Sequence, residues 1–108
     1  MAQKTLWIKE EYLQQILSGR KTIEVRVAYP NLNRLQPGDT LLLNEQYPYR
    51  LVAIRRYPTF EALIAGEDSA AIAPDLSGPE ALLAACRAIY PADKEALGVV
   101  ALEIAPPS

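Results

Sequence analysis

The sequence predicts a small α+β domain, a mixed or antiparallel β-barrel with helices across its ends. The 108 residues are enough for one hydrophobic core, and half of them are hydrophobic. Strand patterns outnumber helical ones. They are also not separated by the regular crossover helices that a doubly wound parallel sheet requires. We therefore expect residues 1–108 to form a single domain.

The first half alternates strand patterns with one amphipathic helix. Runs of β-favouring residues bounded by turn residues predict strands over 5–9, 22–27, 40–44 and 50–57. Residues 10–18 predict a helix, because they carry an apolar stripe, begin with two glutamates and are followed by Gly19. The proline- and asparagine-rich segment 28–39 predicts a loop, and Tyr47-Pro48-Tyr49 predicts a turn.

The second half predicts two helices and a final strand. A short helix over 60–65 follows Thr59, a residue suited to cap it, and a polar, alanine-rich connection then runs through Pro74 and Asp75. Pro79 fits the first turn of a longer helix over 80–89, which Tyr90-Pro91 ends. The apolar run 98–105 predicts the last strand.

The absence of histidine excludes several kinds of active site. The chain has no histidine and one cysteine, Cys86, so it lacks Ser-His-Asp and Cys-His pairs and histidine-containing zinc sites. Cys86 lies in an alanine-rich helical pattern, which indicates a small buried side chain. Because it is the single cysteine, no disulfide can form within the chain. Acid–base chemistry must then use Asp, Glu, Lys, Tyr or a chain terminus. We expect no metal and no cofactor.

Composition also sets expectations about location and partners. Charged residues interrupt any apolar run near the start, and no segment approaches the ~20 apolar residues of a membrane span. We therefore expect a cytoplasmic protein without membrane contact. We also expect a monomer. The net charge is −2, but residues 1–60 hold nine cations against five anions, and residues 61–108 hold two against eight. This asymmetry permits a basic face for a phosphate or a short nucleic acid. The alternative is a set of solvated charges without a partner.

Charged residues gather in the segment GRKTIEVR, Gly19–Arg26. Thr22, Glu24 and Arg26 share one face of the predicted strand, and Lys21 lies at the turn before it. One interpretation is a solvated face with an ion pair worth at most ~1 kcal/mol. The other is a site in which Lys21 stabilises an oxyanion, Glu24 acts as a base and Arg26 anchors a carbonyl or phosphate. The same groups can also bind an amide or a base edge without catalysis.

The pattern G-x-K-x-x-E-x-R in this segment resembles the signature of the ASCH domain family, a branch of the PUA-like fold. The blocks LWIKEEYLQQIL, PGDTLLL and YP…GVVALEI also resemble that family. The resemblance implies a PUA-like mixed β-barrel of about five to six strands flanked by helices, with a cleft whose floor carries the motif. Members have been proposed to bind RNA, and some small bacterial members are amidohydrolases that remove the acyl group of N4-acetylcytidine and related nucleosides.

The resemblance implies some catalytic residues and puts others in doubt. Those amidohydrolases use a lysine, a threonine three residues later and a downstream glutamate. Lys21 matches the lysine, but Glu24 occupies the threonine position, and Asp75 falls near the downstream acid with Glu67 as its rival. We therefore expect water attack with Glu24 as the base, Lys21 as the oxyanion stabiliser or acid, and Asp75 as a second acid or orienter. Thr22 is the alternative nucleophile.

The expected partner is a small modified nucleoside. Trp7 is expected to be core or cleft wall, and Arg55-Arg56 is either a phosphate-steering pair or an exposed strand edge. The alternatives to a nucleoside amidohydrolase are a non-catalytic RNA-binding module, which the net negative charge disfavours, and a ribonuclease, for which the usual histidines are missing. The expected substrate-binding residues are Arg26, Lys9, Thr22 and Tyr29.

Overall fold

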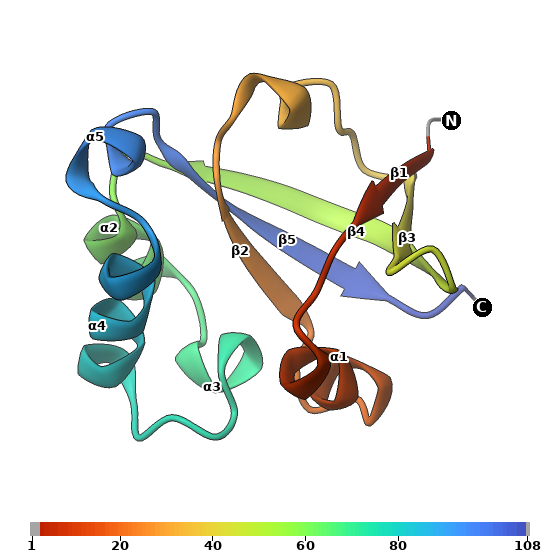
Figure 1. Cartoon of the computed structure of the whole chain (residues 1–108), viewed down its shortest axis with the longest axis horizontal. Helices are drawn as coiled ribbons and strands as arrows, with labels where there is room; N and C mark the ends of the chain where they lie inside the picture. Colours follow the sequence, from red (N-terminus) through yellow and green to blue (C-terminus); the bar gives the residue numbers. More distant parts are fainter. Residues whose placement is uncertain (1–2, 108) are drawn as a thin grey trace.

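The computed structural model describes residues 3–107, which form one five-stranded sheet with helices on both faces (Figure 1). The elements are β1 (Gln3–Leu6), α1 (Glu10–Leu17), β2 (Ile23–Val27), the 3₁₀ helix η1 (Pro30–Leu32), β3 (Thr40–Leu43), β4 (Tyr47–Tyr57), α2 (Phe60–Gly66), α3 (Ser69–Ile72), α4 (Pro79–Ile89), α5 (Ala92–Glu95) and β5 (Val99–Ala105). Within these residues, no helix has the length and hydropathy needed to cross a membrane.

The sheet is a curled half-barrel with the strand order β1-β3-β4-β5-β2. Only the β1–β3 pair is parallel, so the sheet is mixed, as the sequence predicts. The pairing of β4 with β5 shifts register between Leu51 and Ala53, and such an irregularity increases the bend of a strand. The edge strands β1 and β2 are linked by Arg26 in β2, whose guanidinium donates to the carbonyl of Trp7, directly after β1, over 2.9 Å.

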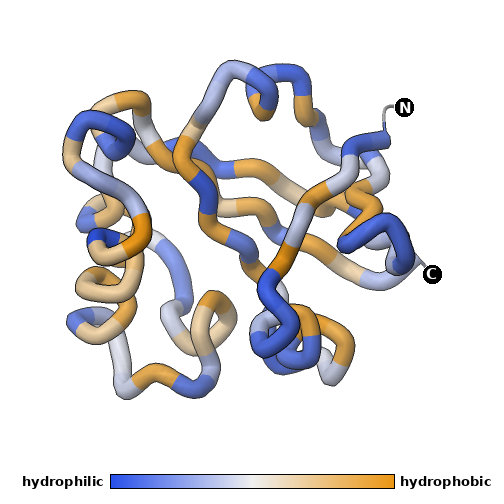
Figure 2. Tube along the Cα trace, viewed as in Figure 1, coloured by the Kyte–Doolittle hydropathy of each residue, from blue (hydrophilic) through white to orange (hydrophobic). Residues whose placement is uncertain are grey.

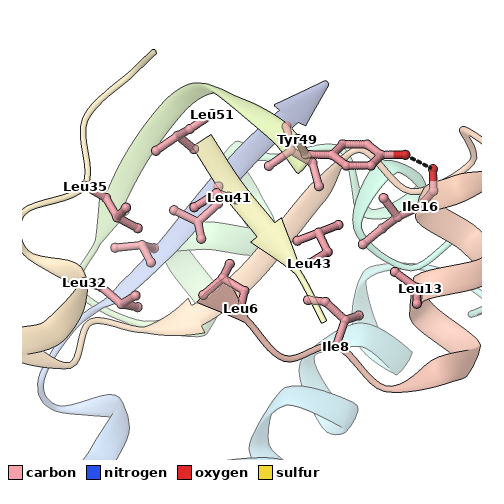
Figure 3. Close-up of a cluster of buried hydrophobic side chains, with 13 residues drawn as sticks. Leu6, Ile8, Leu13, Ile16, Leu32, Leu35, Leu41, Leu43, Tyr49 and Leu51 are labelled. Carbon is pink, nitrogen blue, oxygen red and sulfur yellow. Dashed lines mark hydrogen bonds between the residues drawn. The ribbon is translucent and has the colours of Figure 1, made fainter. Parts of the chain in front are cut away.

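The two faces of the sheet bury two hydrophobic clusters, because side chains alternate along each strand. In β5, Val100 and Leu102 face the cluster under α1, whereas Val99 and Ala101 face the cluster under α2 and α4. Figure 3 shows the first cluster, in which the Tyr49 hydroxyl also donates to the Ile16 carbonyl over 3.4 Å. Hydrophobic positions accordingly run along the strands in Figure 2.

Two predicted boundaries are wrong. The turn falls at residues 44–46, where Asn44 and Glu45 have φ of 52° and 61°, so Tyr47-Pro48-Tyr49 begins β4 and forms no turn. The first strand ends at Leu6, three residues earlier than predicted. The short helices η1, α3 and α5 were not predicted, because three or four residues carry too little periodicity to be recognised.

Candidate functional site

A cleft of about 260 Å³ lies beside β2, between the start of α1 and the α3–α4 region. In Figure 1, α1 and α3 both lie close to the start of β2, where the charged segment begins. One side and the floor come from the β1–α1 connection, α1 and β2, and the other side comes from α3, α4 and the residues next to them. The lining residues are Trp7, Ile8, Lys9, Tyr12, Lys21, Glu24, Val25, Arg26, Ile72, Ala73, Leu76, Leu82, Ala85, Cys86, Ile89 and Tyr90.

Hydrogen bonds to the backbone position two of the segments that carry cleft residues. Gly19 ends α1 with φ of 84°, a conformation that glycine adopts without strain, and the next two N–H groups donate to the Gln15 carbonyl. This turn directs Lys21 into the interior. The segment after β1, on the same side of the cleft, is fixed by the Asn44 side chain, which accepts from the N–H of Ile8 over 2.7 Å and donates to the Ile8 carbonyl over 2.9 Å.

Lys21 is the buried cation of the site. Its side chain is 5% exposed, and its ammonium donates to the carbonyls of Ile23 and Ile72, each over 2.7 Å. Glu24 Oε1 lies 3.2 Å from the same nitrogen. Desolvation lowers the pKa of Lys21, and the charge of Glu24 opposes that shift. Because an ammonium has three donors, these contacts use all of them and tie β2 to α3.

Glu24 lies between two cations. Its Oε2 accepts from Arg26 Nε over 2.8 Å and lies 2.7 Å from Arg26 Nη2, while Oε1 faces Lys21. Only 12% of the Glu24 side chain and 24% of the Arg26 side chain are exposed. The interpretation of this segment as a solvated face therefore does not describe these residues. They form a partly buried Lys–Glu–Arg cluster on the floor of a cleft.

Comparison with known proteins identifies the family and similar folds. A family model for the ASCH domain matches residues 6–108. The chain belongs to the ASCH domain family. The crystal structure of hypothetical protein PH0355 is 28% identical, with a TM-score of 0.90, over 99% of this chain and 100% of that one. The solution NMR structure of protein PF0455 from Pyrococcus furiosus is 30% identical, with a TM-score of 0.79, over 98% and 97% of the two chains. None of the curated protein sequences matches this chain significantly.

Family membership confirms the predicted resemblance and the α+β, PUA-like fold of this ASCH domain. Of the predicted site residues, the structure brings Lys9, Lys21, Glu24 and Arg26 together in the cleft. Thr22 and Tyr29 do not line it. The Thr22 side chain is exposed, and the Tyr29 ring packs near the helices, with Lys94 Nζ 6.0 Å from its centre.

Asp75, the acid that the resemblance placed in the site, does not line the cleft either. Its carboxylate is 61% exposed, lies 2.7 Å from Arg20 and accepts from the Gln15 amide over 3.0 Å. The hydrogen bond from Arg20 is the main cause of the lowered pKa of Asp75. Asp75 therefore fastens the α3–α4 connection to α1. Counting along the sequence cannot reveal this position, because it does not account for the path of α3.

The rival acid, Glu67, also lies outside the cleft. It follows α2, and its carboxylate accepts from Arg55 Nε and Nη2 over 2.7 and 2.8 Å and from the Tyr57 hydroxyl. Arg55 bonds Glu103 as well, over 2.9 Å, whereas Arg56 is exposed. Arg55 is thus a structural connection between β4, β5 and α2, and it does not form a steering pair with Arg56.

Sequence reasoning missed part of the cleft wall. Leu82, Ala85, Cys86 and Ile89 follow the i, i+3, i+4, i+7 spacing of one helix face, so the apolar stripe of α4 was the available signal. That spacing does not show that the face lines a cleft. Cys86 is buried, as predicted, and desolvation raises the pKa of its thiol to about 11. Among residues 3–107, no group of three or more Cys, Asp and Glu side chains is arranged to hold a metal ion.

Proposed function

We propose that this ASCH domain is a metal-independent amidohydrolase that removes the acyl group from N4-acetylcytidine and related N4-acylated cytosine nucleosides. The main support is the Glu24 carboxylate, held between Lys21 and Arg26 on the floor of the cleft. A volume of about 260 Å³ lies just below the usual range for ligand pockets, roughly 300–1,000 Å³. It suits a small molecule better than a polymer.

Glu24 is the proposed general base. Each of its oxygens faces one cation, and a carboxylate oxygen can accept a further hydrogen bond, so a water molecule can bind there too. Glu24 takes a proton from this water, and the water oxygen attacks the acyl carbon. The carbon–nitrogen bond then breaks, and the proton held by Glu24 passes to the exocyclic nitrogen. The products are the cytosine nucleoside and a carboxylic acid.

The oxyanion is assigned to the two cations. Lys21 supplies a positive charge next to Glu24, but direct contact with the oxyanion requires it to exchange one of its present hydrogen bonds. Arg26 has donors to spare, since its bonds within residues 3–107 involve Nε and Nη2 and leave Nη1 for a ligand. We therefore assign the carbonyl oxygen to Arg26 first, with Lys21 as the supporting charge. Such donors typically contribute ~10²–10³ in rate.

RNA binding is the competing function, and the charges of the cleft disfavour it. Affinity for RNA rests mainly on cations that neutralise phosphates. In this cleft, Glu24 already pairs with two of the three cations, Lys21 and Arg26, and leaves Lys9 at the edge. The net charge of −2 also disfavours binding to RNA, which is itself negatively charged.

The direct test follows cytidine release from N4-acetylcytidine by chromatography, with and without a chelator. We expect release that persists in the chelator and does not fall as salt is raised. A lack of release with acetyl and several other acyl groups would contradict the proposed activity. Salt-sensitive binding of an RNA oligonucleotide under those conditions would then favour the binding module.

A further inference from the structure

The two sides of the cleft differ in chemistry. The side built from the β1–α1 connection, α1 and β2 carries its charged side chains, which are Lys9, Lys21, Glu24 and Arg26. The side built from α3, α4 and the connection between them is apolar, and it consists of Ile72, Ala73, Leu76, Leu82, Ala85, Cys86 and Ile89. In Figure 2, α4 is mostly coloured as hydrophobic, and the start of α1 is coloured as hydrophilic. A ligand that fits both sides needs a polar part and an apolar part.

The apolar side continues outward to the mouth of the cleft. Five large hydrophobic side chains are exposed among residues 3–107, and three of them line this cleft. Trp7, at 64% exposure, belongs to the β1–α1 connection, and Leu76 and Ile89, at 43% and 58%, belong to the apolar side. Deeper in the same wall, Leu82 and Cys86 are buried. Exposed apolar groups that gather at a polar cleft mark a ligand-binding surface more often than scattered ones do. The apolar wall is therefore long, and it runs from a buried end to an exposed one.

The charged cluster meets this wall at Lys21. The Lys21 ammonium lies 3.2 Å from Glu24 Oε1 and donates to the carbonyl of Ile72, in the apolar wall, over 2.7 Å. A carbonyl carbon attacked by water on Glu24 would lie at this boundary. Its two substituents then point to different sides. The polar base and sugar match Arg26 and Lys9, and the acyl chain matches α3 and α4.

On the basis of the proposed function, we infer that the α3–α4 wall is an acyl-binding subsite, and that it selects acyl chains longer than acetyl. An acetyl group offers one methyl group to this wall and leaves most of it uncovered. A chain of about four to six carbons can extend along Ala85, whose small side chain leaves room, toward Ile89. Each additional buried methylene is worth roughly a fourfold gain in affinity or in kcat/KM.

The first experiment compares N4-acetyl-, N4-propanoyl-, N4-butanoyl- and N4-hexanoylcytidine. We expect kcat/KM to rise about fourfold for each methylene up to butanoyl and to remain well above the acetyl value for hexanoyl. The Kd of each compound is measured in parallel by calorimetry on the Glu24→Gln variant. Hydrolysis that is fastest with acetyl would overturn the subsite and leave the proposed function standing.

The binding series separates the two proposals when nothing is hydrolysed. If affinity rises with chain length but no compound turns over, the proposed function fails and the apolar subsite stands. If affinity is flat across the series, or no compound binds, the subsite is overturned as well.

Two pairs of variants locate the subsite. Ala85→Phe narrows the cleft beside the apolar wall. It should lower kcat/KM for N4-hexanoylcytidine at least tenfold more than kcat/KM for N4-acetylcytidine. The matched control is Ala88→Phe, on an exposed position of the same helix that does not line the cleft. Ile89→Ser changes a side chain at the mouth that needs no repacking, with Leu97→Ser, 52% exposed and outside this cleft, as its control. Equal chain-length dependence in Ile89→Ser and Leu97→Ser would contradict the assignment.

Discussion

Lys21 contributes to the fold as well as to the proposed chemistry. Its ammonium is buried, and it joins the carbonyls of Ile23 and Ile72 to Glu24. Removing one partner of a buried, hydrogen-bonded charge leaves the other groups without compensation. Loss of activity in a Lys21 variant is therefore ambiguous unless stability is measured with it.

Replacement of Lys21 should destabilise the protein. In Lys21→Met the apolar stem is largely kept, but two buried carbonyls and Glu24 lose their donor, so we expect the free energy of unfolding to fall by about 2–5 kcal/mol. Urea denaturation measures it. Lys9→Met is the control, because Lys9 also lines the cleft but is exposed. Equal unfolding midpoints in the two variants would contradict the buried position of Lys21.

Cys86 should react slowly, although it lines the cleft. Its thiol has a pKa of about 11, whereas a free thiol has a pKa near 8.5, and only the thiolate is nucleophilic. At pH 8.5 we expect alkylation on the order of 100-fold slower than that of a free thiol, rising with pH toward 11. Mass spectrometry follows the modification, with urea-unfolded protein as the control. Labelling as fast in the folded as in the unfolded chain would be inconsistent with this environment.

At the scale of elements, two acidic side chains tie one wall of the cleft and a helix outside it to the rest of the fold. Asp75 fastens the α3–α4 connection, which carries Leu76, to Arg20 and Gln15 at the end of α1. Glu67 fastens the end of α2 to β4 through Arg55 and Tyr57. Both acids were candidates for catalysis from the sequence. The structure instead gives each of them a partner outside the cleft.

Asp75→Asn tests this placement. We expect turnover within a few-fold of the wild type and a small decrease in Tm, because an exposed ion pair contributes little. The assay is cytidine release, with Asp93→Asn, also exposed and outside the cleft, as the control. A loss of turnover as large as that of a Glu24 variant would show that Asp75 reaches the reacting atoms.

Glu67 should stabilise the fold in a pH-dependent way. The hydrogen bond from Arg55 is the main cause that holds the pKa of Glu67 below its ordinary value of 4.5. A carboxyl group with a lower pKa in the folded state stabilises the protein above its unfolded pKa and loses this effect as the pH falls through the folded pKa. We therefore expect Glu67→Gln to lower the free energy of unfolding by about 1–3 kcal/mol at pH 7 and by less below about pH 4.5.

The measurement for Glu67 is urea unfolding at pH 7 and at pH 3. Glu103→Gln is the control, because Glu103 bonds the same arginine but is 40% exposed against 3% for Glu67. A cost for Glu67→Gln that is the same at both pH values would show that its carboxylate is not the stabilising form.

At the scale of the whole molecule, the sequence predicts local patterns well and long-range placement poorly. The alternation in 22–27, the apolar run in 98–105 and the stripe of 10–18 predict β2, β5 and α1, because each pattern records which side chains are buried. The three charged residues of the G-x-K-x-x-E-x-R motif, Lys21, Glu24 and Arg26, line one cleft.

The remaining features depend on contacts between distant segments. The parallel pairing of β1 with β3, the link from Arg26 to Trp7 and the bonds from Lys21 to Ile72 leave no local signal in the sequence. The partners of Asp75 and Glu67 are likewise fixed by how the helices pack. For the same reason, the apolar stripe of α4 predicts a buried face but does not reveal that this face lines the cleft.

The central claim is that Glu24 activates water in this cleft, and one comparison tests it most directly. The rate of cytidine release from N4-acetylcytidine is measured in a chelator for the wild type, Glu24→Gln and Glu103→Gln. Glutamine keeps the shape but cannot act as a base, so we predict that Glu24→Gln lowers the rate by ~10²–10⁴ while Glu103→Gln, which also loses an ion pair with an arginine, stays near the wild type. Equal rates for the wild type and Glu24→Gln would contradict the account.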